Sequence, residues 1–153
     1  MHTTQELQRM AIELIPDFDG VYPINHLPIT YKKSYKLIVN LDSDNLPGTH
    51  WIAVFVRPNK KGFVLDSLGY PPPLKLQHWL NIRGIEWECN KRQVQASEST
   101  MCGYYCIYFL WFMSSSTFEN EHFVNIINIL FPPKSIYTYY DSIVKDFANI
   151  MKI

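Results

Sequence analysis

The feature that most constrains the fold of this chain is the run CGYYCIYFLWFM at residues 102–113, which is apolar nearly all round. A helix that is hydrophobic on every side lies in the interior of a protein, so we expect a central helix over residues 102–113. The run is shorter than the roughly 18 apolar residues that suggest a membrane span. We therefore expect a soluble protein with no membrane partner.

A second apolar run predicts the centre of a sheet. Residues 52–56, IAVFV, are continuously apolar and rich in β-branched side chains, which is typical of a strand buried on both faces. The Asn-Lys-Lys-Gly turn at 59–62 then predicts an antiparallel hairpin. The strands that we expect are at residues 35–41, 51–57, 63–68 and 85–90.

Helices are predicted on both sides of these strands. Thr3-Thr4-Gln5-Glu6 has the form of a capping box, and the apolar stripe that follows it predicts a helix that Pro16 ends. The Pro- and Tyr-rich residues 21–31 predict irregular or loosely extended chain, and further helices are expected at 74–81, 119–130 and 136–151. The predicted fold class is α+β, with a small, mostly antiparallel sheet packed against helices around the buried one.

Composition bounds the class of protein. The 153 residues, 47% of them hydrophobic, suit one domain at 1–153 with a substantial core. Fourteen basic and fourteen acidic residues cancel, which excludes a global attraction to nucleic acid and leaves only local basic patches. Three cysteines cannot all pair within the chain, and the N-terminus has no signal peptide, so we expect an intracellular, non-secreted protein.

A set of nucleophilic and titratable side chains follows the order His50, Asp66, Gln95, Cys102. A thiol attacks a carbonyl only as thiolate, and both a helix N-terminus and a nearby imidazole stabilise that anion. Cys102 opens the predicted central helix, while the hairpin brings His50 and Asp66 toward the same end of the sheet. This order excludes a papain-like arrangement, in which the cysteine comes first.

Each residue also has a simpler interpretation. Taken singly, Cys102 is interpreted as a small core residue and His50 as a surface histidine. Asp66 is interpreted as the end of a strand, and Gln95 by itself predicts no site. The joint pattern favours a catalytic site. A metal site built from Cys102, Cys106 and a histidine such as His122 lacks the usual C-x₂-C spacing, so we expect no metal.

Three blocks of the sequence resemble the signature blocks of the adenovirus-type maturation protease, adenain. This is a cysteine peptidase in the clan that includes the ubiquitin-like-protein-specific proteases. The blocks are GTHWIA at 48–53, VLDSLGY at 64–70, and VQ at 94–95 followed by MCGYYC at 101–106. The resemblance covers roughly residues 5–113.

The resemblance implies a role for each site residue. Cys102 would be the nucleophile, His50 the general base, Asp66 the third member of the triad, and Gln95 the side-chain donor to the oxyanion. Two further positions are substrate-binding candidates, because Trp51 would pack beside the histidine and shape the site, and Gly103 would let a substrate backbone approach closely.

The resemblance also implies a function. The protein would be a cysteine endopeptidase, encoded by a virus or mobile element, that cleaves virion or capsid precursor proteins after small residues such as glycine. It would act in the host nucleus or assembly site and in the virion. The sequence itself requires no cofactor, but family members are activated by DNA and by a short peptide that can form a disulfide with an enzyme cysteine. Cys89 is the candidate for that disulfide, and a half-buried strand cysteine is its simpler interpretation.

Two alternatives remain. Adenovirus enzymes usually carry Glu as the acid, whereas Asp66 is the choice of the ubiquitin-like-protein proteases. One alternative is therefore a protease that removes ubiquitin or a ubiquitin-like modifier from host proteins. The other alternative is a non-catalytic virion scaffold with a protease-derived fold, although a scaffold has no need of the complete set of four residues.

Overall fold

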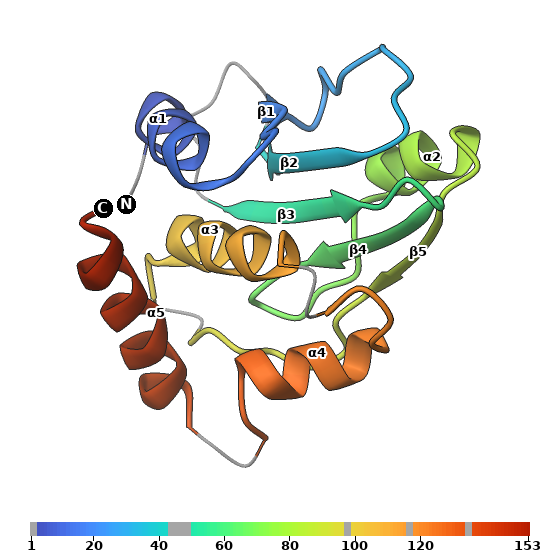
Figure 1. The fold of residues 1–153 in the computed structure, drawn as a ribbon. Coiled ribbons are helices and arrows are strands. Elements are labelled where there is room, and N and C mark those ends of the chain that lie inside the picture. The colour runs from blue at the N-terminus through green and yellow to red at the C-terminus, as the bar shows by residue number, and fades with distance from the viewer. Residues whose placement is uncertain (1–2, 43–49, 97–98, 116–117, 134–135) are drawn as a thin grey trace.

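A five-stranded mixed sheet forms the centre of the computed structural model, which describes residues 3–42, 50–96, 99–115, 118–133 and 136–153 (Figure 1). The strands follow chain order across the sheet. They are β1 (Gly20–Pro23), β2 (Tyr35–Asn40), β3 (Trp51–Val56), β4 (Lys61–Leu65) and β5 (Glu86–Cys89). The helices of the described residues are α1 (Thr4–Leu14), α2 (Leu74–Ile82), α3 (Cys102–Met113), α4 (Phe123–Leu130) and α5 (Tyr137–Met151).

The pairing of the sheet corrects one prediction. β2–β3 and β3–β4 are antiparallel, as the hairpin predicted, but β1–β2 and β4–β5 are parallel, so the sheet is not mostly antiparallel. The parallel pairing of β5 arises because the chain after β4 crosses over through α2 and then runs in the direction of β4.

The chain predicted to be irregular or loosely extended over 21–31 begins with a paired strand, β1, which the sequence did not predict. A four-residue strand that ends in proline carries little periodicity of its own. Its position depends on partners elsewhere, since it pairs with β2 and the Val21 N–H donates to Gln8 Oε1 of α1 at 2.9 Å.

Helices cover both faces of the sheet, and α3 lies along β3 (Figure 1). Because side chains alternate along a strand, Ala53 and Phe55 pack into the core that includes α1, α3, α4 and α5, while Ile52 and Val54 pack on the face covered by α2. Every residue of β3 is buried, which confirms the prediction of a central strand buried on both sides.

The helix bounds follow their local signals. The Thr3 hydroxyl caps α1 by accepting from the Glu6 N–H at 3.1 Å, and α1 ends at Leu14, shortly before Pro16. α3 has the predicted bounds and is largely buried. None of the described helices has the length and apolar character needed to cross a membrane.

The segment between β5 and α3 is fastened to α5. Arg92 Nη1 donates to the Tyr140 hydroxyl at 2.8 Å. The fully buried Tyr105 hydroxyl of α3 lies 2.6 Å from Asp141 Oδ1 and 3.2 Å from the Val94 carbonyl. α5 therefore supports the residues that lead to Gln95.

Candidate active site

His50 and Asp66 meet at one end of the β3–β4 hairpin. His50 directly precedes β3 and Asp66 directly follows β4, and antiparallel pairing places these two ends side by side. His50 Nε2 lies 2.7 Å from Asp66 Oδ1, and the two side chains are only 17% and 3% exposed. This distance is that of a charge-assisted hydrogen bond.

His50 also interacts with Cys102, the first residue of α3. Burial lowers the pKa of His50, but hydrogen bonds to Asp66 and to the Cys102 side chain outweigh burial and raise it from 6.5 to about 9. Since Nε2 faces Asp66, Nδ1 is the ring nitrogen left for the sulfur. The structure thus brings three of the predicted site residues together.

The backbone of Asp66 is held on both sides by one buried side chain. The Asp66 N–H donates to Asn90 Oδ1 at 2.9 Å, and Asn90 Nδ2 donates to the Asp66 carbonyl at 2.7 Å. Asp66 Oδ1 also accepts from the Leu68 N–H at 2.9 Å. The carboxylate that faces His50 is therefore fixed in place by its own loop and by the residue after β5.

Gln95, the fourth predicted residue, is tied to the residue that follows Asp66. Its side-chain Oε1 accepts a hydrogen bond from the Ser67 hydroxyl, and its Nε2 donates to the Ser99 carbonyl at 2.8 Å. Gln95 is 1% exposed, so its amide is oriented by protein groups.

The two candidate substrate-binding residues, Trp51 and Gly103, are both buried. Trp51 is 1% exposed and belongs to the core on the α3 side of the sheet, so it offers a substrate no surface of its own. Its predicted packing role remains compatible with this position. Gly103 lies in the first turn of α3. Gly48 and Thr49 of the first sequence block lie outside the described residues.

Sequence reasoning missed Ser67 and Asn90. Among the described residues, the buried polar or charged side chains are Asn40, Asp66, Ser67, Asn90 and Gln95. Four of them form two hydrogen-bonded pairs, Asp66 with Asn90 and Ser67 with Gln95, which adjoin because Ser67 follows Asp66 in the chain. The only signal for Asn90 was a polar residue at the end of a strand, and for Ser67 its place after Asp66.

The other cysteines lie apart from this chemistry. Cys106 is 1% exposed, and burial raises the pKa of its thiol well above the usual value, so it is a core residue as expected. Cys89 is half-buried at the end of β5. Within the described part of the chain, no group of three or more His, Cys, Asp or Glu side chains is placed to hold a metal ion.

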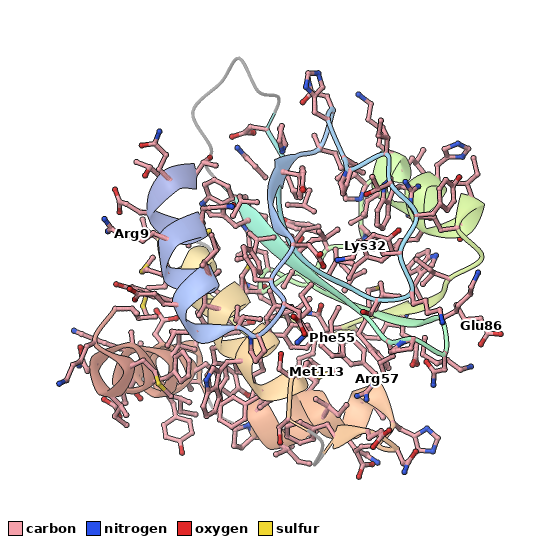
Figure 2. All side chains as sticks on the ribbon, turned by 45° about the horizontal axis from the view of Figure 1, so that its top comes forward. Arg9, Lys32, Phe55, Arg57, Glu86 and Met113 are labelled. Atoms are coloured by element: carbon pink, nitrogen blue, oxygen red, sulfur yellow. The ribbon has the colours of Figure 1, made fainter. Side chains whose placement is uncertain are left out.

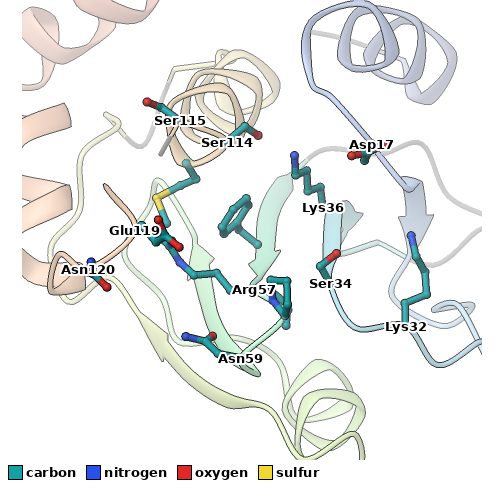
Figure 3. Close-up of a pocket in the computed structure, with 14 residues that line it drawn as sticks. Asp17, Lys32, Ser34, Lys36, Arg57, Asn59, Ser114, Ser115, Glu119 and Asn120 are labelled. Atoms are coloured by element: carbon teal, nitrogen blue, oxygen red, sulfur yellow. The ribbon is translucent and has the colours of Figure 1, made fainter. Parts of the chain in front are cut away.

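A cavity of about 700 Å³ is lined by Val56 at the end of β3 and by Met113 at the end of α3 (Figure 3). His50 and Cys102 lie at the starts of these two elements, away from the cavity. Phe55, Arg57 and Met113 gather there (Figure 2). Lys32, Lys36 and Arg57 line it, but Asp17 and Glu119 also line it and Asp19 pairs with Lys32. Its charges cancel, and it has no part in the arrangement around Cys102.

Comparisons with known proteins support the fold alone. No family model and no curated protein matches the sequence. The structure is similar to that of a viral cysteine protease, the ASFV pS273R protease, with a TM-score of 0.56 and 19% sequence identity. The match covers 75% of this chain and 42% of that protease, so this chain accounts for less than half of the protease's length. The chain therefore shares an α+β fold with a viral cysteine protease.

Proposed function

We propose that this protein is a cysteine endopeptidase, with residues 1–153 as its protease domain. Cys102 is the nucleophile, His50 the acid–base group, Asp66 its orienting carboxylate and Gln95 a donor to the oxyanion. The observation that carries the proposal is the position of His50, which is hydrogen-bonded to both Asp66 and Cys102 at the N-terminus of a buried helix.

The first half of the reaction forms a thioester. The Cys102 thiolate adds to the scissile carbonyl carbon, and the carbonyl oxygen becomes an oxyanion. The C–N bond then breaks as the His50 imidazolium gives its Nδ1 proton to the leaving amine. Asp66 holds the ring through Nε2 during this transfer, because that hydrogen bond does not depend on the substrate.

The second half restores the enzyme. Neutral His50 takes a proton from water, and the hydroxide so formed adds to the thioester carbonyl. The C–S bond breaks, and the products are a carboxylic acid and the Cys102 thiolate with protonated His50. In both halves the oxyanion would accept hydrogen bonds from the Gln95 amide and from the Cys102 backbone N–H at the start of α3.

We further propose that the substrates are precursor proteins of a virion, cleaved after small residues, as in the adenain-like proteases. The similarity in fold to a viral cysteine protease and the three adenain-like sequence blocks support this choice. Incubation with a proteome-derived peptide library, followed by mass-spectrometric sequencing of new termini, tests it. We expect cleavage after glycine or another small residue, and none with Cys102→Ala.

The activated thiol can be tested without knowledge of the substrate. Iodoacetamide alkylation of each cysteine is followed by peptide mass mapping between about pH 5 and 9, in the wild type and in His50→Ala. We expect fast labelling of Cys102 below neutral pH that slows in His50→Ala. Cys89 supplies a reference rate, and the buried Cys106 reports any unfolding. Labelling of Cys102 no faster than that of Cys89 at every pH would refute the proposal.

A further inference from the structure

We propose that Ser67 is a positioning residue that holds the Gln95 amide in the orientation needed to donate to the oxyanion. The inference rests on the proposed function, but its evidence is separate from the geometry of His50 and Cys102. Ser67 is 2% exposed, directly follows Asp66 in the chain, and donates a hydrogen bond to the side chain of Gln95.

Three hydrogen bonds join Ser67 to the segment that carries Gln95. The Ser67 carbonyl accepts from the Val94 N–H at 2.8 Å and from the Gln95 N–H at 2.9 Å. The Ser67 hydroxyl donates to Gln95 Oε1. Both the backbone and the side chain of Gln95 are thus located relative to one serine.

The direction of the amide follows from what lies at its two ends. Nε2 donates to the Ser99 carbonyl at 2.8 Å, and a carbonyl can only accept. A reversed amide would set Oε1 against that carbonyl oxygen, and one hydrogen bond would be replaced by repulsion. With Oε1 held by Ser67, one N–H of Nε2 donates to Ser99, and we assign the second N–H to the oxyanion.

The same turn connects this amide to the acid. Ser67 directly follows Asp66, and Gly69 in the same turn has a positive φ of 83°. A Cβ on Gly69 would lie 2.9 Å from the Gln93 backbone nitrogen, so the turn packs closely against the segment before Gln95. Buried polar side chains that have their hydrogen-bond partners are held rigidly, and rigidity is what a preorganised oxyanion donor needs.

Removal of the hydroxyl should therefore affect one step of the chemistry. Ser67→Ala leaves Oε1 of Gln95 buried without its donor, and the amide gains freedom to rotate. Loss of an entire oxyanion donor costs roughly 10²–10³ in rate, and Ser99 still holds the amide, so we expect roughly a tenfold loss. Ser67→Thr, which keeps the hydroxyl, should recover most of the rate.

Two reagents distinguish the oxyanion from the thiolate. Acylation of Cys102 by p-nitrophenyl acetate passes through an oxyanion, whereas alkylation by iodoacetamide does not. Both rates are measured in the wild type, Ser67→Ala, Gln95→Ala and the double variant, with circular dichroism to confirm folding. We expect Ser67→Ala to slow acylation roughly tenfold, to add no further slowing in Gln95→Ala, and to leave alkylation within about twofold of the wild type.

Acylation at the wild-type rate in Ser67→Ala would overturn the inference. The inference would also fail if Ser67→Ala slowed acylation by the same factor in the wild type and in Gln95→Ala. If Ser67→Ala does not fold, Ser67→Cys replaces it, because a thiol has similar shape and donates weakly. Ser67→Cys should lower the acylation rate by a smaller factor, and this effect must again disappear when Gln95 is replaced by alanine. Failure of the proposed function would look different, because wild-type Cys102 would then lack alkylation that depends on His50.

Discussion

The charge of Asp66 should control the protonation of His50. The substitution Asp66→Asn keeps the size of the side chain and its Oδ1 acceptor but removes the negative charge 2.7 Å from His50 Nε2. The hydrogen bonds of Asn90 to the Asp66 backbone do not involve the carboxylate, so the loop itself should remain in place.

The size of the effect follows from the pKa of His50. A rise from 6.5 to about 9 corresponds to roughly 3 kcal/mol, since one pKa unit is about 1.4 kcal/mol. Burial lowers the pKa of His50, whereas the interactions with Asp66 and with Cys102 both raise it. If Asp66 supplies about half of the rise, Asp66→Asn lowers the pKa of His50 by about one unit. At any pH above the pKa, the fraction of His50 in the imidazolium form then falls roughly tenfold.

The unfolding free energy should also depend on the protonation of His50. Because the folded protein has the higher pKa, the protonated ring contributes stability that is fully present below about pH 6.5 and is lost as pH rises through about 9. The difference in unfolding free energy between the wild type and Asp66→Asn should therefore shrink across this window. Urea denaturation at about pH 6 and pH 9.5 measures it.

NMR titration of the imidazole Cε1–H signals gives the pKa directly. His50→Ala identifies the His50 signal, and Cys102→Ala removes the contribution of the sulfur alone. We expect a midpoint near 9 in the wild type and a lower one in Asp66→Asn. A wild-type midpoint near 6.5, or the same midpoint in Asp66→Asn, would refute the reasoning.

Four further predictions concern rate and stability. Peptide hydrolysis should decline as pH rises through about 9, because neutral His50 cannot protonate the leaving amine, and a pH–rate profile measures this limb. Gln95→Ala should lower kcat roughly 10²–10³-fold while Cys102 is alkylated at the wild-type rate; unchanged kcat would exclude its assigned role. Tyr105→Phe should lower the unfolding free energy by about 2 kcal/mol in urea titrations, since it removes a buried hydroxyl bonded to α5. Thr3→Ala should cost about 1 kcal/mol through loss of the α1 cap, with Thr3→Ser as the control that retains it.

Local sequence signals predicted most of the elements. The bounds of α3 follow from one apolar run, and β3 from another, because in both cases the burial of a segment is visible in its own residues. β1 escaped prediction because its pairing with β2 and its contact with Gln8 stabilise four residues that have no strand pattern alone. The parallel direction of β5 depends on the crossover through α2, which no local pattern records.

The same division holds for the candidate site. His50 and Asp66 were predictable as neighbours because a hairpin fixes the position of both strand ends. Ser67 and Asn90 were not, because serine and asparagine are common in turns and at strand ends. Their contacts with Gln95 and Asp66 span 28 and 24 positions along the chain and appear only after the sheet is assembled.

The two faces of the sheet divide the tryptophans evenly. Trp51 and Trp111 belong to the core on the α3 side, whereas Trp79 and Trp87 belong to the cluster under α2. Replacement of either pair by phenylalanine would leave an intrinsic fluorophore in one layer only. The emission of the two double variants during denaturation would then report each layer separately, and coincident transitions would mean that both layers melt as one cooperative unit.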